Sequence, residues 1–334
     1  MPTRKTKTID LGLRAELSVR GLRPAPLLRR RAGACPSDDG HWTLDGTPLT
    51  LPTAPDSPWA RASDGTLTRD GVMVDAKLAA IRRPRFYDLE TADGTPYGQL
   101  ARLHGEDVLA ATVMQTPVTC PEQLAEVALA AVRLDRVRQL VMTTGAADGR
   151  DRGARHLARC VAAVHAVLPD LPIQVQTEPP LDLVWIRRLH GAGARAIGIH
   201  IEALDQDVRR RWTPGKATVS LARYEEAWIE AVAVFGRNRV STYLLIGLGE
   251  DPDELVAGAR RLIAMGVYPF VVPHRPLVGG LAHGDGVPAP SHEIVADVTD
   301  RVGRALRNAG MRGADQAAGC AACGACSALS AVGG

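Results

Sequence analysis

Residues 121–142 read Pro121-Glu-Gln-Leu-Ala-Glu-Val-Ala-Leu-Ala-Ala-Val-Arg-Leu-Asp-Arg-Val-Arg-Gln-Leu-Val-Met142, and this stretch decides the fold. Proline suits the first position of a helix, and apolar residues from Leu124 to Ala131 recur at helical spacing on one stripe. The apolar run Val137–Met142 that follows predicts a buried strand. A helix followed at once by a buried strand is the repeating unit of an α/β protein.

The same alternation extends on both sides of this stretch, from about residue 107 to residue 309. Strands are expected at Val108–Met114, Val137–Met142, Ile173–Gln176, Ala196–Ile201, Val240–Ile246 and Val267–Val272. Helices are expected at 121–134, 152–168, 182–190, 205–211, 220–235, 252–265 and 291–309. Strands that alternate with helices pair in parallel through right-handed crossovers. The pattern suits either a partial (βα)6 TIM-like barrel or an open doubly wound sheet.

The chain divides into three parts on this view. Residues 1–80 are expected to form an irregular extension, because proline-rich runs such as Leu51–Pro58 disfavour helices. Residues 81–310 hold the barrel. Residues 311–334 form a cysteine-rich tail whose Gly, Ala and Ser flanks predict no role in packing.

Polar residues at the strand ends favour the barrel, in which ligands bind at the carboxyl ends of the strands. We expect a polar mouth with cofactor-binding residues Thr144, Gly145, Gln176, Glu178, His200, Glu202, Gly247 and Gly249. His274 and Arg275 after the last strand are further candidates for binding a carboxylate. The alternative for the two glutamates is that backbone amides or arginines satisfy them.

Three cysteines lie two residues apart in the tail: Cys320, Cys323 and Cys326. This spacing is typical of iron–sulfur ligation and compatible with zinc, and idle thiols are the remaining alternative. Cys120 stands at the start of the helix at 121–134, where helix amides favour a thiolate. It is either a fourth ligand or a small residue that fills a turn.

Composition excludes several functions. The net charge is +3 and aromatic residues make up 4% of the chain, which argues against nucleic-acid partners. No apolar run approaches the roughly 18 residues of a membrane span, so we expect a cytoplasmic protein. A reducing compartment would keep the tail thiols available for metal.

Several motifs occur in order along these strands. They are Thr143-Thr-Gly145, Gln176-Thr-Glu178, Gly198-Ile-His-Ile-Glu202, Arg209-Arg-Arg-Trp-Thr-Pro-Gly-Lys216 and Tyr243-Leu-Leu-Ile-Gly-Leu-Gly-Glu250. Together they resemble the radical SAM superfamily, in a biotin-synthase-like branch associated with nitrilase gene clusters. The resemblance implies a partial barrel, S-adenosylmethionine (SAM), a [4Fe–4S] cluster and radical C–H chemistry. It also implies a small-molecule substrate, for which the basic run suggests an anion, and an electron donor such as a flavodoxin or ferredoxin.

The chain departs from that family at one place. The family carries three cysteines in the loop after its first strand, whereas here Gln115-Thr-Pro-Val-Thr-Cys120 holds a single one. One thiolate cannot hold a cluster with an open iron. The sequence therefore leaves three hypotheses: an active radical SAM enzyme, an inactive iron–sulfur or zinc-binding relative, and a metal-independent barrel enzyme that uses His200 and Glu202 as acid and base.

Overall fold

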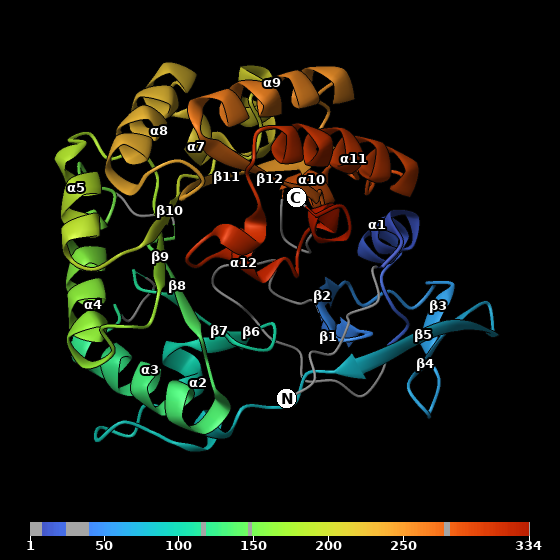
Figure 1. Ribbon diagram of the computed structural model, residues 1–334, viewed down its shortest axis with the longest axis horizontal. Helices are drawn as coiled ribbons and strands as arrows, with labels where there is room; N and C mark the ends of the chain where they lie inside the picture. The colour runs from blue at the N-terminus through green and yellow to red at the C-terminus, as the bar shows by residue number, and fades with distance from the viewer. Residues whose placement is uncertain (1–8, 25–39, 115–117, 146–148, 277–280, 334) are drawn as a thin grey trace.

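A curled sheet of seven strands forms the centre of the molecule (Figure 1). The structure is a computed structural model that describes residues 9–24, 40–114, 118–145, 149–276 and 281–333. The strand order is β12-β11-β10-β9-β8-β7-β6. The bounds are β6 Arg102–His104, β7 Val108–Thr112, β8 Gln139–Thr143, β9 Ile173–Gln176, β10 Ala196–Gly198, β11 Val240–Ile246 and β12 Val267–Pro273.

Strands β7 to β12 are parallel to their neighbours, as the alternation predicts. The sheet therefore has the form of a partial TIM-like barrel, and the open doubly wound alternative does not apply. The sequence pattern missed β6, which pairs antiparallel with β7 across a tight turn at Gly105. A strand of three residues is too short to show a periodic pattern of apolar and polar residues.

Helices cover the outer face of the curled sheet (Figure 1). The larger ones are α3 Pro121–Asp135, α4 Ala154–Val167, α5 Val184–Gly191, α8 Leu221–Phe235, α9 Pro252–Met265 and α11 His292–Asn308, with α6 Gln206–Trp212 and α7 Pro214–Ala217 between β10 and α8. Short turns α2 Tyr97–Leu100 and α10 Leu281–Gly284 complete the described helices, together with α1 and α12 below. Within the described ranges no helix has both the length and the apolar character to span a bilayer.

Residues 40–80 correct the expectation of an irregular extension. They form an antiparallel sheet in the order β2-β1-β5-β4-β3. Its strands are β1 Gly40–Leu44, β2 Thr47–Leu51, β3 Trp59–Arg61, β4 Thr66–Arg69 and β5 Val72–Ala80. Asp45-Gly46 and Asp70-Gly71 both have positive φ, as the two-residue turns of hairpins require. Trp42, Leu44 and Leu78 give this sheet a core of its own, and helix α1 Leu11–Arg20 packs against it.

The cysteine-rich tail is packed, which corrects the expectation that it has no role in packing. Its helical turn α12 Cys320–Cys323 lies inside the curl of the sheet (Figure 1). Beyond it, Ala325 and Leu329 are each 1% exposed. Gly319 passes so close to Gln174 that a Cβ there would lie 2.1 Å from its side-chain nitrogen. Small residues let the backbone approach the sheet closely, and this is their role in the tail.

Three contacts hold the tail from two sides. Arg14 of α1 donates hydrogen bonds to the carbonyl oxygens of Gly324, Ala325 and Ser327 at 3.1, 2.7 and 3.3 Å. The Thr50 N–H of β2 donates to the Ala325 carbonyl at 3.0 Å. On the barrel side, the Gly319 N–H donates to Gln139 Oε1 at 2.7 Å. The tail thus joins the N-terminal sheet to the interior of the barrel.

Candidate functional site

A cavity of about 260 Å³ opens at the carboxyl ends of strands β8 to β11. Its walls are Thr143, Thr144, Gly145, Gln176, Thr177, Glu178, His200, Glu202, Lys216 and Tyr243. Six of the eight residues expected to bind a cofactor therefore come together, because the carboxyl ends of parallel strands meet at one edge. We call this cavity the mouth.

Each glutamate of the mouth is paired with a cation. Glu202 Oε1 lies 3.0 Å from Lys216 Nζ, and Glu178 Oε2 lies 3.3 Å from Arg152 Nη1. Lys216 also donates to the His200 carbonyl at 2.6 Å. The sequence left open whether the two glutamates bind a ligand or are satisfied by arginine, and the structure shows ion pairs at both. All four charged groups are only partly exposed, so solvent screens them less than surface pairs.

Glu202 has a left-handed backbone conformation, with φ of 72°. Such a conformation is unfavourable for a residue with a side chain and is often found at binding sites. Hydrogen bonds on both sides hold it in place: its N–H donates to the Tyr243 carbonyl at 2.9 Å, and its carbonyl accepts from Leu245 at 2.8 Å. The neighbouring strand therefore directs the carboxylate of Glu202 into the mouth.

His200 and Tyr243 form a flat floor in the mouth. Their rings are stacked, with centroids 4.2 Å apart and planes 10° apart. Both ring nitrogens of His200 are buried and have no hydrogen-bond partner among the described residues. Burial, and then the charge of Lys216, lowers the pKa of His200 to about 3. The imidazole is therefore neutral near pH 7 and is a poor general acid there, which speaks against the acid–base hypothesis.

The neutral state of His200 leads to a pH prediction. Its folded-state pKa of about 3 lies below the ordinary value of 6.5. The unfolded chain therefore takes up this proton first, and the associated stability is lost as the pH falls from 6.5 toward 3. We expect His200 alone to lower the free energy of unfolding by up to about 1.4 kcal/mol per pH unit in that window.

Urea unfolding at several pH values measures this dependence of the free energy of unfolding on pH. His200→Gln should flatten the curve and the exposed-site control His190→Gln should not, whereas parallel curves for wild type and His200→Gln would contradict the assignment.

Two of the three glycines expected in the site lie outside the mouth, whereas Gly145 lines it. Gly247 and Gly249 occupy the β11–α9 loop with φ of 100° and 111°. A Cβ at Gly247 would lie 2.8 Å from the side chain of Pro290, so this glycine permits close packing. A Cβ at Gly249 would meet no atom within 4 Å, so there only the backbone conformation requires glycine.

Two basic segments that were candidates for ligand binding, 274–275 and 209–216, mainly make contacts within the fold. Arg275 donates to the Thr50 carbonyl at 3.2 Å and thus faces the N-terminal sheet, and His274 does not line the mouth either. Arg209 is fully buried, and its guanidinium donates to the carbonyls of Ala203 and Leu204 at 2.7 and 2.8 Å. Of the basic run 209–216, only Lys216 lines the mouth.

Sequence reasoning missed Tyr243 and Arg152 as parts of the site, and it included Lys216 only within the basic run 209–216. Tyr243 carried a usable signal, because it lies within the strand that precedes the Gly-x-Gly turn. Arg152 carried none, and the run did not single out Lys216, since each reaches its glutamate from a helical segment or loop outside the strand ends. Their approach depends on how the helices pack on the sheet.

Cys120, Cys320 and Cys323 are free thiols with separate surroundings. Cys120 caps α3, and its Sγ donates to Glu122 Oε2 at 2.9 Å. Gln176 Nε2 lies 3.7 Å from Cys320 Sγ, directly under the mouth. Cys323 lies against Gly105, and its pKa is raised to about 12 by burial. Cys326 Sγ lies 3.6 Å from His104 Nε2 and is held in a disulfide.

No group of three or more His, Cys, Asp or Glu side chains within the described ranges is placed to hold a metal ion. Burial also raises the pKa of Cys320, so neither of the two free thiols in the tail is a thiolate near neutral pH. Nothing in this arrangement supports the zinc alternative.

Comparison with known proteins bears on the same region. Residues 117–263 match the radical SAM superfamily. A segment of 138 residues is 28% identical to the bacteriochlorophyllide c C-7(1)-hydroxylase of Chlorobaculum limnaeum. It covers 41% of this chain and 34% of that relative, so the match spans about a third of the relative's length.

The radical SAM superfamily implies SAM and a [4Fe–4S] cluster as cofactors. The polar, charged mouth fits the first of these. The cysteines do not fit the second: the β7–α3 connection holds one thiol, Cys120, Cys320 lies against Gln176, and no cysteine lines the mouth. We therefore assign no reaction step to a cluster in this chain.

Proposed function

We propose that this protein binds SAM in the mouth of its half-barrel. The observation that carries the proposal is that two ion pairs, Glu202–Lys216 and Glu178–Arg152, occur beside the stacked rings of His200 and Tyr243. All ten residues that line the mouth lie within the segment 117–263 that matches the superfamily.

The charges of the mouth complement those of SAM. The ligand carries an α-carboxylate, an α-ammonium group and a positive sulfonium. Lys216 and Arg152 can pair with the carboxylate, and Glu178 and Glu202 can accept charge-assisted hydrogen bonds from the ammonium group or the ribose hydroxyls. The flat His200–Tyr243 floor offers a stacking surface to the adenine, which its neutral imidazole suits.

The volume of the mouth indicates that binding requires a small rearrangement. Its 260 Å³ lies just below the usual range of about 300–1,000 Å³ for ligand pockets. Both partners of the Glu202–Lys216 pair line the cavity, so parting them would enlarge it. The ligand then replaces an internal ion pair with two new ones, which keeps each charge compensated.

Thermal and urea unfolding in the presence of SAM test the proposal. At 100 times its dissociation constant, SAM should raise the free energy of unfolding by roughly 2.7 kcal/mol by mass action. We expect Glu202→Gln to weaken SAM binding at least tenfold in calorimetry, because a neutral amide leaves the ligand's positive charge without a partner. The matched control is Glu225→Gln on the exposed face of α8, which should bind like the wild type. Stability that does not change up to millimolar SAM would refute the proposal.

A further inference from the structure

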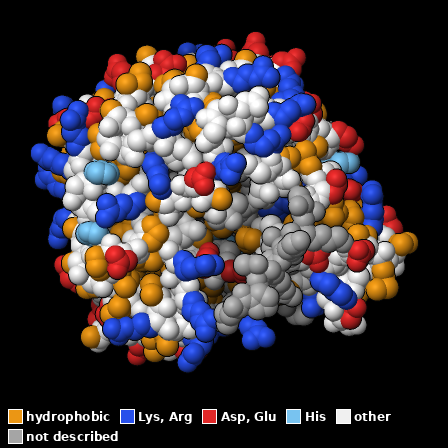
Figure 2. Space-filling view, in the orientation of Figure 1, with side chains coloured by type: hydrophobic (Ala, Val, Ile, Leu, Met, Phe, Trp, Pro, Cys, Tyr) orange, Lys and Arg blue, Asp and Glu red, His pale blue; other side chains and the backbone are white. Residues whose placement is uncertain are grey.

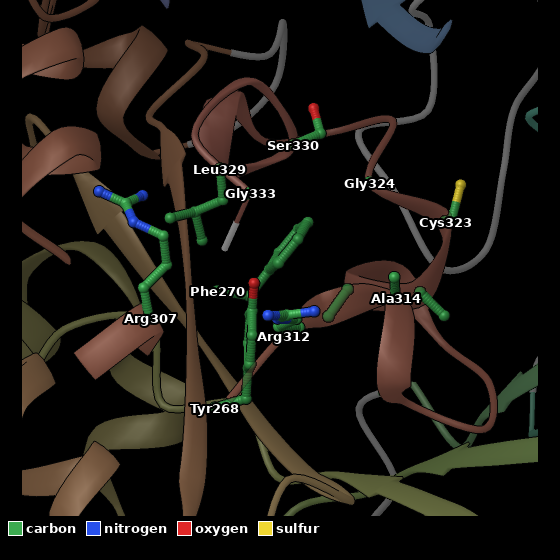
Figure 3. A pocket seen from close by; sticks show the side chains of 12 residues that line it. Tyr268, Phe270, Arg307, Arg312, Ala314, Cys323, Gly324, Leu329, Ser330 and Gly333 are labelled. Atoms are coloured by element: carbon green, nitrogen blue, oxygen red, sulfur yellow. The ribbon is translucent and has the colours of Figure 1, made fainter. Parts of the chain in front are cut away.

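A second and larger cavity, of about 540 Å³, lies between strand β12, helix α11 and the tail (Figure 3). It shares no lining residue with the mouth. Tyr268 and Phe270 of β12 form one wall, and Ala322 and Cys323 of the tail form another. Nothing in the proposed binding of SAM uses this cavity.

The cavity exists because two unlike surfaces meet at the edge of the sheet. Tyr268 and Phe270 are both 1% exposed and lie two residues apart, so their rings stand on the same face of the edge strand. The tail opposite them is built from small residues, Ala321, Ala322 and Gly324 among them. Large rings against small side chains leave a hollow that the chain does not fill.

The charged side chains of the cavity are all basic. Two guanidinium groups line it, Arg307 from the last turn of α11 and Arg312 just after that helix, and no acidic residue does. Arg307 already donates to the Val332 carbonyl, so Arg312 is the cation available to a ligand. Burial raises the pKa of Tyr268, so its phenol stays neutral and can donate a hydrogen bond. Burial likewise raises the pKa of Cys323 to about 12, so this thiol carries no charge that would repel an anion.

We propose that this second cavity binds an aromatic carboxylate. The rings of Tyr268 and Phe270 contact the aromatic body, and Arg312 pairs with the carboxylate, a group that guanidinium recognises through two parallel hydrogen bonds. The volume of 540 Å³ lies in the middle of the range for small-molecule pockets, about 300–1,000 Å³, and accommodates a ligand of one or two rings.

Isothermal calorimetry with 1-naphthoate on the full chain tests the proposal. We expect wild-type protein to bind 1-naphthoate and to bind the uncharged 1-naphthalenemethanol at least tenfold more weakly. Arg312→Gln, at an exposed position, should weaken naphthoate binding at least tenfold. The control is Arg133→Gln, which removes an exposed arginine of α3 and should leave the affinity unchanged.

Two further variants separate this cavity from the mouth. Ala322→Phe fills the second cavity and should abolish naphthoate binding while SAM binding persists. Glu202→Gln should leave naphthoate binding intact, since the two cavities share no residue. No naphthoate binding by the wild type, equal binding of the alcohol, or an unchanged affinity in Arg312→Gln would each overturn the proposal. If Ala322→Phe fails to fold, the affinity of Arg312→Gln for naphthoate still tests the proposal.

Discussion

Protein reconstituted with iron and sulfide under anaerobic conditions, then incubated with SAM and dithionite, should form 5′-deoxyadenosine only at the level of the protein-free control. Reductive cleavage requires an iron–sulfur cluster held beside the sulfonium, and one thiolate cannot hold a cluster with an open iron. The connection between Thr112 and Pro121 contains one thiol, that of Cys120, and Cys120 does not line the mouth. We expect SAM to bind and to remain intact.

Quantitative chromatography of the nucleoside product measures this outcome. Cys120→Ser should change neither SAM binding nor the background level of product. The decisive control is the triple variant Cys320→Ser, Cys323→Ser and Cys326→Ser. Many turnovers in the wild type that disappear in this variant would show that the tail supplies the ligands, and our account of these cysteines would be wrong.

Arg14→Met should lower the free energy of unfolding by about 1–3 kcal/mol. The Arg14 side chain is almost fully buried, and its guanidinium donates to three carbonyl oxygens of the tail, those of Gly324, Ala325 and Ser327. Methionine keeps most of the packing of the side chain but cannot donate. The Ala325 carbonyl keeps its hydrogen bond from the Thr50 N–H and the Ser327 carbonyl keeps that from the Ser330 hydroxyl, so the main loss is at the Gly324 carbonyl. A buried carbonyl that loses its partner costs about 1–3 kcal/mol.

Urea denaturation of the wild type and of Arg14→Met measures the decrease in the free energy of unfolding. The matched control is Arg20→Met on the same helix, α1, where the side chain is exposed and the change should cost no more than about 0.5 kcal/mol. Limited proteolysis offers a second measurement, because a tail freed from α1 should be cleaved faster than the barrel. A loss below 1 kcal/mol together with an unchanged cleavage pattern would contradict the role that we assign to Arg14.

Surface charge is spread over the face shown in Figure 2, where basic, acidic and apolar side chains are interspersed. This agrees with the small net charge of +3. Mixed charge gives no broad field that would attract a polyanion to this face. The charges that matter for binding are therefore the few inside the two cavities.

The barrel could be predicted from the sequence because its signals are local. The strand expected at Val240–Ile246 has those bounds in the structure, and the helix expected at 252–265 is α9. Periodicity within one segment defines such elements. Parallel pairing then brings the strand ends together, which is why Thr144, Gln176, Glu178, His200 and Glu202 could be foreseen at one mouth.

The N-terminal sheet carried a local signal that the proline-rich composition obscured. Asp45-Gly46 and Asp70-Gly71 are hairpin turns that can be recognised in the sequence. Prolines such as Pro52 exclude helices but do not exclude short antiparallel strands bounded by turns. The error was to treat resistance to helix formation as a lack of regular structure.

Segments that are distant in the chain decide the remaining features. The Gly324 carbonyl accepts a hydrogen bond from Arg14, which lies 310 residues away, and the Gly319 N–H donates one to Gln139, which lies 180 residues away. The sequence by itself determined the order of helices and strands, the polar mouth and the single thiol after β7. Only the tertiary structure decided that the cysteine-rich tail packs inside the curl, that the two glutamates are paired, and that a second cavity remains. Burial and ion pairing depend on contacts between segments, and no local pattern in the chain encodes them.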